Sequence, residues 1–287
     1  MNSSREAAQR SQKMTDFLAA LVSIAFHGTA YAMVLYIVSV GLSVTMGLMG
    51  FVNLAHGVFA MAGGYVTVTL MNNYDTPFGL ALAAGVISVA AVSVVLERLL
   101  YARLYTAGEL DQVLFSIGLI FMSIAAAKFF WGSLPQRIVV PEALRGQIDL
   151  GFRSFPAYRA FLIAVSFALI LGLWLGVERT TFGAQIRAAV DNRRMAQSIG
   201  INTSRLFTLT FALGSGLAAL GGGLGAEIMA IHPGFAIEHL VYFLIVVAVG
   251  GLGSIRGPFV AALLLGIGDT ACKYWIPELG AFFIYAA

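Results

Sequence analysis

Long apolar stretches recur along this chain, and their length constrains the fold more than any other feature. A bilayer core about 30 Å thick is crossed by roughly 20 apolar residues in a helix that rises about 1.5 Å per residue. Inside lipid every backbone amide must also be paired, which an α-helix achieves within itself. The chain is therefore predicted to be helical and membrane-spanning. The clearest stretches cover 78–96, 112–131, 158–177, 206–230, 238–252 and 258–276.

A further apolar region, from Phe17 to Leu70, is too long for one span. With the other stretches it predicts about eight segments in an all-α, polytopic transmembrane helical bundle that includes broken or re-entrant segments. Composition agrees, because only 11% of the residues are charged, whereas a globular domain carries about 25%. Residues 1–287 are expected to form a single membrane domain with a polar tail at 1–15. The net charge of +3 gives no indication of a nucleic-acid partner.

The start of the chain allows a second interpretation. Lys13, the apolar run from Phe17 to Phe26 and the small residues Ala30 and Ala32 imitate a secretory signal peptide with its cleavage site. Apolar character continues well beyond Ala32, which favours an uncleaved first membrane segment.

Positive charge indicates which loops face the cytoplasm, because Lys and Arg are preferentially retained on that side. The segment 179–205 carries five arginines and is predicted to lie inside, whereas 72–77 and 232–239 carry no Lys or Arg and are predicted to lie outside. A charged block between two membrane-length segments favours a docking loop for a soluble partner. The alternative is an ordinary inner loop whose arginines anchor its flanks.

Two segments fit this charge pattern less simply. The segment 132–157 holds three arginines, yet alternation places it outside. Its prolines and its length predict a small periplasmic cap where an external partner can sit. The polar tail is also basic, which favours the inside. With the tail inside, two spans before residue 72 would place 72–77 inside, whereas its lack of Lys and Arg places it outside. Either the tail lies outside or one segment is re-entrant.

The region from 41 to 64 places glycines, Asn53 and His56 where hydrocarbon is expected. A glycine weakens a helix by up to about 1 kcal/mol relative to alanine. Non-helical backbone is tolerated at membrane depth only where it is buried in protein or lines a watery cavity. Asn53 and His56, with Gly57, are therefore candidate residues of a path through the membrane. Equally, Asn53 can cap the next helix while His56 bonds a neighbouring one.

A second glycine-rich interruption, 250–258, precedes another apolar helix much as 47–50 does. Paired interruptions in two halves are a mark of transporters built from repeats. An internal repeat is one hypothesis, and a chance likeness is the other.

Ionisable residues within membrane segments are functional candidates, because exposing a charge to lipid is costly. Glu97 lies beside Arg98 and is expected at the inner interface. Glu227, near the outer end of its helix, is a candidate for the path or for a partner contact, or is simply a solvated end. Asp269 lies deepest, and Lys273, four residues later on the same helix face, can pair with it.

Enzyme and channel functions find little support. The chain has no G-x-x-x-x-G-K-[ST] phosphate loop, no H-E-x-x-H pair for zinc and no G-x-S-x-G nucleophile. It is therefore predicted to hold no catalytic residue, metal or cofactor of its own. Asn53-Leu-Ala55 is similar to the Asn-x-Ala turn of water and glycerol channels. No second copy is present, however, and a channel does not explain the segment 179–205.

Three groups of residues, in their order and spacing, resemble the branched-chain amino-acid ABC importer permeases of the smaller, H-type (LivH) subunit. They are Gly50-Phe-Val-Asn-Leu-Ala-His-Gly57; Gly183-Ala-Gln-Ile-Arg-Ala188 with Ile199-Gly-Ile-Asn202 and Leu209-Thr-Phe211; and Gly250-Gly-Leu-Gly-Ser-Ile-Arg-Gly-Pro258. Each group alone is modest, but the ordered set covers nearly the whole chain from about Phe17.

The resemblance implies an importer in the bacterial inner membrane, where this chain and a second, LivM-like permease subunit form the path. Two cytoplasmic ATPase subunits, which bind ATP and Mg, drive transport, and a periplasmic binding protein delivers the substrate. The segment 179–205 then corresponds to the coupling loop, whose short helix inserts into the ATPase. The expected coupling residues are Arg187, Ala188, Ala189, Asp191, Arg193, Arg194 and Gly200. The expected path residues are Asn53, His56, Gly57, Glu227 and Asp269.

The resemblance also implies branched-chain or other hydrophobic amino acids as cargo. Urea, short amides and aromatic acids, which relatives carry, stay open because no residue identifies the cargo directly. The sequence departs from the family at its end, where members continue through a final apolar helix but Gly280 to Ala287 stops less than halfway across a bilayer. The chain is therefore expected to be truncated.

Overall fold

The chain folds into a bundle of long helices, which the computed structural model describes for residues 2–51, 53–105, 107–149, 151, 153–280 and 283. The helices are α1 (Asn2–Met49), α2 (His56–Tyr74), α3 (Phe78–Leu96), the π-helical turn η1 (Glu97–Tyr101), α4 (Ala102–Leu104), α5 (Glu109–Trp131), the 3-10 turn η2 (Glu142–Leu144), α6 (Ala157–Arg179), α7 (Thr181–Asp191), α8 (Arg193–Ser198), α9 (Thr203–Gly225), α10 (Phe235–Glu238), α11 (Leu240–Gly250), α12 (Arg256–Trp275) and α13 (Pro277–Gly280). Strands β1 (Gln147–Asp149) and β2 (Ser154–Pro156) form an antiparallel hairpin. The predicted truncation concerns residues that, apart from Gly280 and Phe283, lie outside the described part.

The all-α membrane fold predicted from the apolar stretches is confirmed. Within the described residues, five helices are long and apolar enough to cross a membrane, at 12–47, 78–104, 109–131, 157–177 and 203–225. Helices α2, α11 and α12 belong to the same bundle, which gives about eight segments. The region 17–70 is divided between α1 and α2, and the division falls at residues 50–55.

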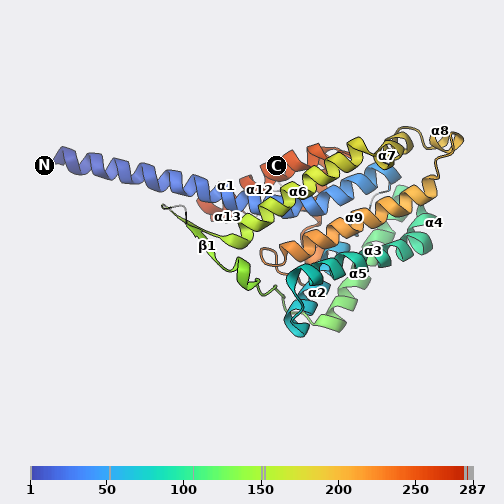
Figure 1. The fold of residues 1–287 in the computed structure, drawn as a ribbon, viewed down its shortest axis with the longest axis horizontal. Helices are drawn as coiled ribbons and strands as arrows, with labels where there is room; N and C mark the ends of the chain where they lie inside the picture. Colours follow the sequence, from blue (N-terminus) through green and yellow to red (C-terminus); the bar gives the residue numbers. More distant parts are fainter. Residues whose placement is uncertain are drawn as a thin grey trace.

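Helices α1 and α9 form the centre of the bundle. In the most apolar part of α9, 72% of the residues are buried, against 17% in α5 and 11% in α6. Helix α1 packs against α12, α9, α11 and α6, while α9 also packs against α2 and α3 (Figure 1). The outer helices α3, α5 and α6 therefore turn wide apolar faces away from the bundle, as lipid or another membrane subunit requires.

Small residues let the central helices approach closely. A Cβ atom placed on Gly222 of α9 would lie 1.9 Å from the carbonyl oxygen of Ala60 in α2. One placed on Gly41 of α1 would lie 2.4 Å from the carbonyl oxygen of Gly214 in α9. Neither position can hold a side chain unless backbone moves. Glycine thus sets these helix distances, as expected where van der Waals contact replaces the hydrophobic effect between membrane helices.

The two ends of the bundle differ. The start of α1, the β1–β2 hairpin and α13 lie at one end, whereas α4, α7 and α8 lie at the other (Figure 1). Residues 2–15 of the predicted polar tail form the first turns of α1, which projects beyond the bundle. Of the two alternatives for the tail, the structure matches the one that places it opposite the charged segment 179–205. The alternation of inner and outer loops along the chain then requires no re-entrant segment.

The segment 132–157 is tied to the loop that follows α9. Gln136 and Ile231 exchange two backbone hydrogen bonds, each 2.8 Å long, as an isolated antiparallel bridge. Arg145 Nε donates a hydrogen bond of 2.7 Å to the carbonyl oxygen of Val140 within the segment. The hairpin then leads directly into α6.

Candidate functional site

A buried asparagine stabilises the turn between α1 and α2. Gly50 follows the end of α1 with a φ of +61°, a left-handed conformation that glycine adopts without strain. Asn53 Oδ1 accepts hydrogen bonds from the N–H of Ala55 at 3.1 Å and from the hydroxyl of Tyr101 at 3.2 Å. These bonds form the turn that leads the chain into α2.

His56 and Gly57 pack the start of α2 against its neighbours. His56 is 1% exposed, and its Nε2 lies 3.1 Å from the carbonyl oxygen of Val38 in α1. A Cβ atom on Gly57 would lie 3.2 Å from Ala236 of α10. The interhelical bond expected for His56 is present, but Asn53 does not cap α2, because the N-cap residue is Ala55 and it makes no side-chain cap hydrogen bond. A role in transport stays a prediction for all three residues.

Glu97 is buried within the protein, and its expected position near the inner surface of the membrane stays a prediction. The carboxylate is 2% exposed; its Oε1 accepts a hydrogen bond of 2.6 Å from the hydroxyl of Tyr105, and its Oε2 one of 2.8 Å from Thr208 of α9. Glu97 and Tyr101, the first and last residues of the π-helical turn η1, are both buried. Burial, and then the bond to Glu97, raises the pKa of Tyr105, so its hydroxyl keeps the proton that it donates.

Replacing Tyr105 with phenylalanine is expected to destabilise the folded protein by about 1–3 kcal/mol, because Glu97 Oε1 stays buried and loses its donor. The midpoint of thermal unfolding of the purified protein in detergent measures this loss. Tyr74→Phe is the matched control, since Tyr74 is 71% exposed at the end of α2. Equal midpoints for the two variants would contradict a stabilising role for this buried bond.

The two glycine-rich interruptions meet in space. The carbonyl oxygen of Ser43 in α1 accepts a hydrogen bond of 2.9 Å from the N–H of Gly253, and the Ser43 hydroxyl donates to the carbonyl oxygens of Gly251 and Ser254 at 3.0 Å. Gly251 and Gly253 have φ values of +90° and +75°, which only glycine adopts readily. The sequence comparison of 47–50 with 250–258 missed this contact. Whether the two halves are repeats stays a prediction.

Three side-chain caps shape the charged segment 179–205. Thr180, Asn192 and Asn202 each accept a hydrogen bond from the backbone N–H three residues later, at 3.0–3.2 Å, where α7, α8 and α9 begin. These residue types are favoured at helix N-termini because their side-chain oxygens satisfy backbone donors that lack a partner. The segment is therefore a pair of short helices joined by sharp turns.

The inner side of α7 and α8 packs onto the bundle. Ala189 is 3% exposed and belongs to a small apolar cluster with Phe207 of α9. The guanidinium of Arg193 lies 4.5 Å from the centre of the Phe207 ring, and Arg187 donates a hydrogen bond to the carbonyl oxygen of Val177 in α6. Both arginines therefore fix the position of the segment.

Apart from the buried Ala189, the predicted coupling residues are at least partly exposed, and Arg187 and Arg193 are among the exposed ones. Asp191, Arg194 and Gly200 are exposed and Ala188 is half-buried. Gly200 has a φ of +90° in the turn before α9. The structure thus brings the seven predicted residues into one unit but presents only some of them to a partner.

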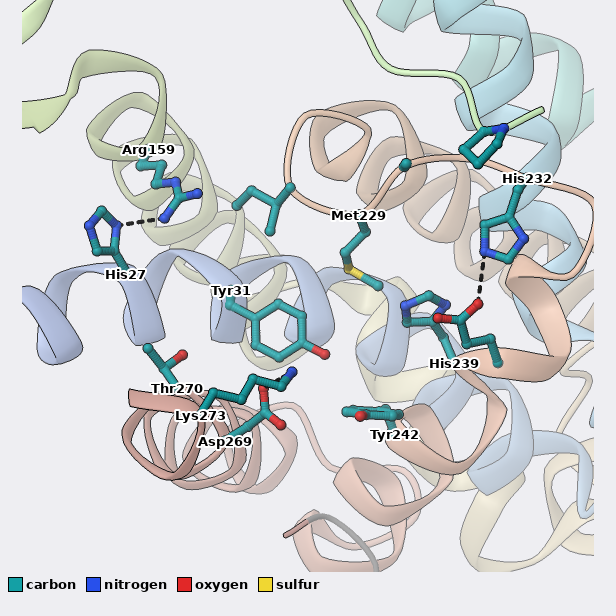
Figure 2. Close-up of a pocket in the computed structure, with 14 residues that line it drawn as sticks. His27, Tyr31, Arg159, Met229, His232, His239, Tyr242, Asp269, Thr270 and Lys273 are labelled. Carbon is teal, nitrogen blue, oxygen red and sulfur yellow. Dashed lines mark hydrogen bonds and ion pairs between the residues drawn. The ribbon is translucent and has the colours of Figure 1, made fainter. Parts of the chain in front are cut away.

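A pocket of about 460 Å³ opens at the opposite end of the bundle, and we name it the hairpin-side pocket (Figure 2). Its walls come from α1, the segment 132–157, the start of α6, the loop after α9, α10, the start of α11 and the end of α12. Asp269 lines it, and the predicted pairing is confirmed, with Lys273 Nζ 2.7 Å from Asp269 Oδ2. Glu227 is half-buried next to the lining residue Ile228, and its Oε2 has no hydrogen-bond partner among the described residues.

Two further polar pairs line the hairpin-side pocket. Arg159 lies 2.6 Å from His27, and His232 lies 2.8 Å from Glu238. Across the described part of the chain, no group of three or more His, Cys, Asp or Glu side chains could hold a metal ion. The pocket therefore combines the Asp269–Lys273 ion pair with two hydrogen-bonded side-chain pairs.

Comparison with known proteins identifies the family. The family described as "Branched-chain amino acid transport system / permease component" matches residues 24–287. The chain belongs to this family. Like its homologues, this permease is a membrane subunit of a transport system and not an enzyme. No solved protein structure shows significant similarity to it.

Curated relatives of this permease cover most of its length. It is 29% identical to the high-affinity branched-chain amino acid transport system permease protein BraD of Pseudomonas aeruginosa, over 88% of this chain and 85% of the relative. It is 27% identical to the corresponding protein LivH of Escherichia coli, over the same shares. It is 24% identical to the probable LivH of Methanocaldococcus jannaschii, over 86% of this chain and 79% of the relative. The resemblance drawn from the sequence motifs is confirmed.

Proposed function

We propose that this permease is one of two membrane subunits of an ATP-binding-cassette importer for branched-chain or other hydrophobic amino acids in the bacterial inner membrane. The names of the relatives support this cargo. Urea, short amides or aromatic acids are the alternative cargoes within the same importer class. A small-solute channel is the less favoured alternative, because it gives no role to the capped helices of the segment 179–205.

The observation that carries this proposal is the surface presented by α7, α8 and the turn that follows. The same helices and turn that carry the exposed Arg194 also carry Val190, Met195 and Ile199, whose apolar side chains are 45%, 64% and 70% exposed. We name these four residues the coupling surface. Clustered apolar side chains that face water beside charges mark an interaction site. A cytoplasmic ATPase subunit, with ATP and Mg bound to that subunit, fits this end of the bundle.

The other proposed partners fit other faces of the bundle. A second, LivM-like permease subunit would cover part of the apolar surface that α3, α5 and α6 turn outward, and lipid the rest. The periplasmic binding protein would dock at the opposite end, where the segment 132–157 and the loop after α9 are joined. The substrate path would then run beside the α1–α2 break toward the coupling surface.

Purification of the tagged permease from its native membrane, with mass spectrometry of the retained proteins, tests this proposal. We expect a second permease subunit and two ATPase subunits in the complex. Thermal-shift screening of the associated binding protein against leucine, urea, short amides and aromatic acids then identifies the cargo. A permease that purifies alone under mild detergent would refute the importer, and a binding protein stabilised only by urea or amides would refute the amino-acid cargo.

A further inference from the structure

The Asp269–Lys273 pair in the hairpin-side pocket has an unused hydrogen-bond acceptor. The Asp269 side chain is 2% exposed, and its Oδ2 is bound by Lys273. Its Oδ1 is buried and has no hydrogen-bond partner among the described residues. A buried carboxylate oxygen without a donor is costly, and ionisable groups within membrane helices are commonly functional. The free oxygen is therefore a position for a donor that the described residues do not supply.

Lys273 supplies hydrogen-bond donors beside this acceptor. Its side chain is 53% exposed, so its ammonium can reach both Asp269 and a molecule in the pocket. An ammonium has three donor hydrogens, and the bond to Asp269 uses one of them. Figure 2 shows the two side chains rising from α12 toward Tyr31, with Met229 and Tyr242 on the neighbouring walls. One free acceptor and free donors of opposite charge thus lie side by side.

We propose that Asp269 Oδ1 binds the α-ammonium of a free amino acid while Lys273 binds its α-carboxylate; this inference rests on the proposed importer function. The two charged groups of an amino acid are attached to one carbon atom, so they match two adjacent protein charges of opposite sign. Charge-assisted hydrogen bonds of this kind are stronger than bonds between neutral groups. Urea and amides carry no net charge, so they would form no bond between opposite charges with either Asp269 Oδ1 or Lys273. The pair therefore selects amino acids over the neutral cargoes.

The rest of the pocket suits the same ligand. Its volume of about 460 Å³ falls in the range of roughly 300–1,000 Å³ that is typical of small-molecule sites. Ile228 and Met229 add apolar lining for an aliphatic side chain. Arg159 adds positive charge across the pocket, whereas Glu238 is already bound by His232 at 2.8 Å. Asp269 is thus the carboxylate available to an ammonium group.

Reconstituted proteoliposomes that contain the complete importer test the proposal. Binding protein loaded with radiolabelled leucine is added, and leucine transport and ATP hydrolysis are measured on the same sample. We expect Asp269→Asn to lower leucine transport at least ten-fold, while stimulation of ATP hydrolysis by the loaded binding protein stays within two-fold of wild type. Asp16→Asn, the same change at an exposed position of α1 outside the pocket, is the matched control and is expected to transport within two-fold of wild type.

The double variant Asp269→Asn, Lys273→Gln tests whether misfolding explains a loss of transport. It keeps a hydrogen-bonding pair and leaves no buried charge unpaired. It should show the same loss of transport with ATP hydrolysis retained. Parallel loss of transport and ATP hydrolysis in this variant would overturn the proposal and assign the pair to docking or folding. Unchanged transport in either variant would also overturn it. A wild-type complex that neither transports leucine nor hydrolyses ATP would instead refute the proposed function.

Discussion

Replacing Gly222 with leucine is expected to abolish the folded permease. A Cβ atom at this position would lie 1.9 Å from the carbonyl oxygen of Ala60, so the first added carbon already overlaps backbone of α2. Relief requires α2 and α9 to separate, and overpacking of a rigid interface costs about 3 kcal/mol. The loss is expected to be larger here because α9 is the most buried of the five long helices. Fluorescence-detected size-exclusion chromatography of the tagged, solubilised protein measures the folded fraction.

Gly118→Leu is the matched control for this substitution. Gly118 also lies inside a membrane-spanning helix, α5, but a Cβ atom there meets no other atom within 4 Å. This variant should give a wild-type chromatographic peak, because the new side chain extends away from the bundle. A symmetrical wild-type peak for Gly222→Leu would show that α2 and α9 do not pack in this arrangement.

The positions of the helices could be predicted from the sequence because hydrocarbon thickness imposes their length. The stretch 78–96 is reproduced residue for residue by α3, and 258–276 differs from α12 by one or two residues at each end. The Asp269–Lys273 pair was predictable for a similar reason, since i, i+4 spacing places both side chains on one helix face. Each of these inferences depends only on local geometry.

Contacts between distant segments could not be predicted in this way. Ser43 and Gly251 are 208 residues apart, and no periodicity in either segment indicates that they meet. The hydrogen bonds that Glu97 accepts from Tyr105 and from Thr208 of α9 are likewise not indicated by any sequence pattern. The residues that line the hairpin-side pocket come from segments between His27 and Lys273, so they are brought together only when the helices pack.

The second large effect is expected at the coupling surface, where Arg194→Glu should uncouple transport from ATP hydrolysis. Arg194 is exposed on α8, so its replacement leaves the packing of the segment unchanged. Reversal of a charge within a docked interface costs about 2–5 kcal/mol when the partner group becomes desolvated beside a like charge. That cost corresponds to at least a ten-fold loss of bound ATPase subunit. Co-purification of the ATPase subunits and leucine transport by the reconstituted complex measure the two consequences.

Arg103→Glu is the control for Arg194→Glu because it makes the same charge reversal at the same end of the bundle. Arg103 is exposed on α4, outside the segment 179–205. It should retain its ATPase subunits and transport within two-fold of wild type. Arg193→Glu distinguishes docking of the ATPase from positioning of the segment 179–205, because Arg193 lies against the Phe207 ring. Arg193→Glu should lower the thermal stability of the permease, whereas Arg194→Glu should not. If Arg194→Glu retained its ATPase subunits and transported leucine as the wild type does, the coupling surface would be excluded as the site where the ATPase docks.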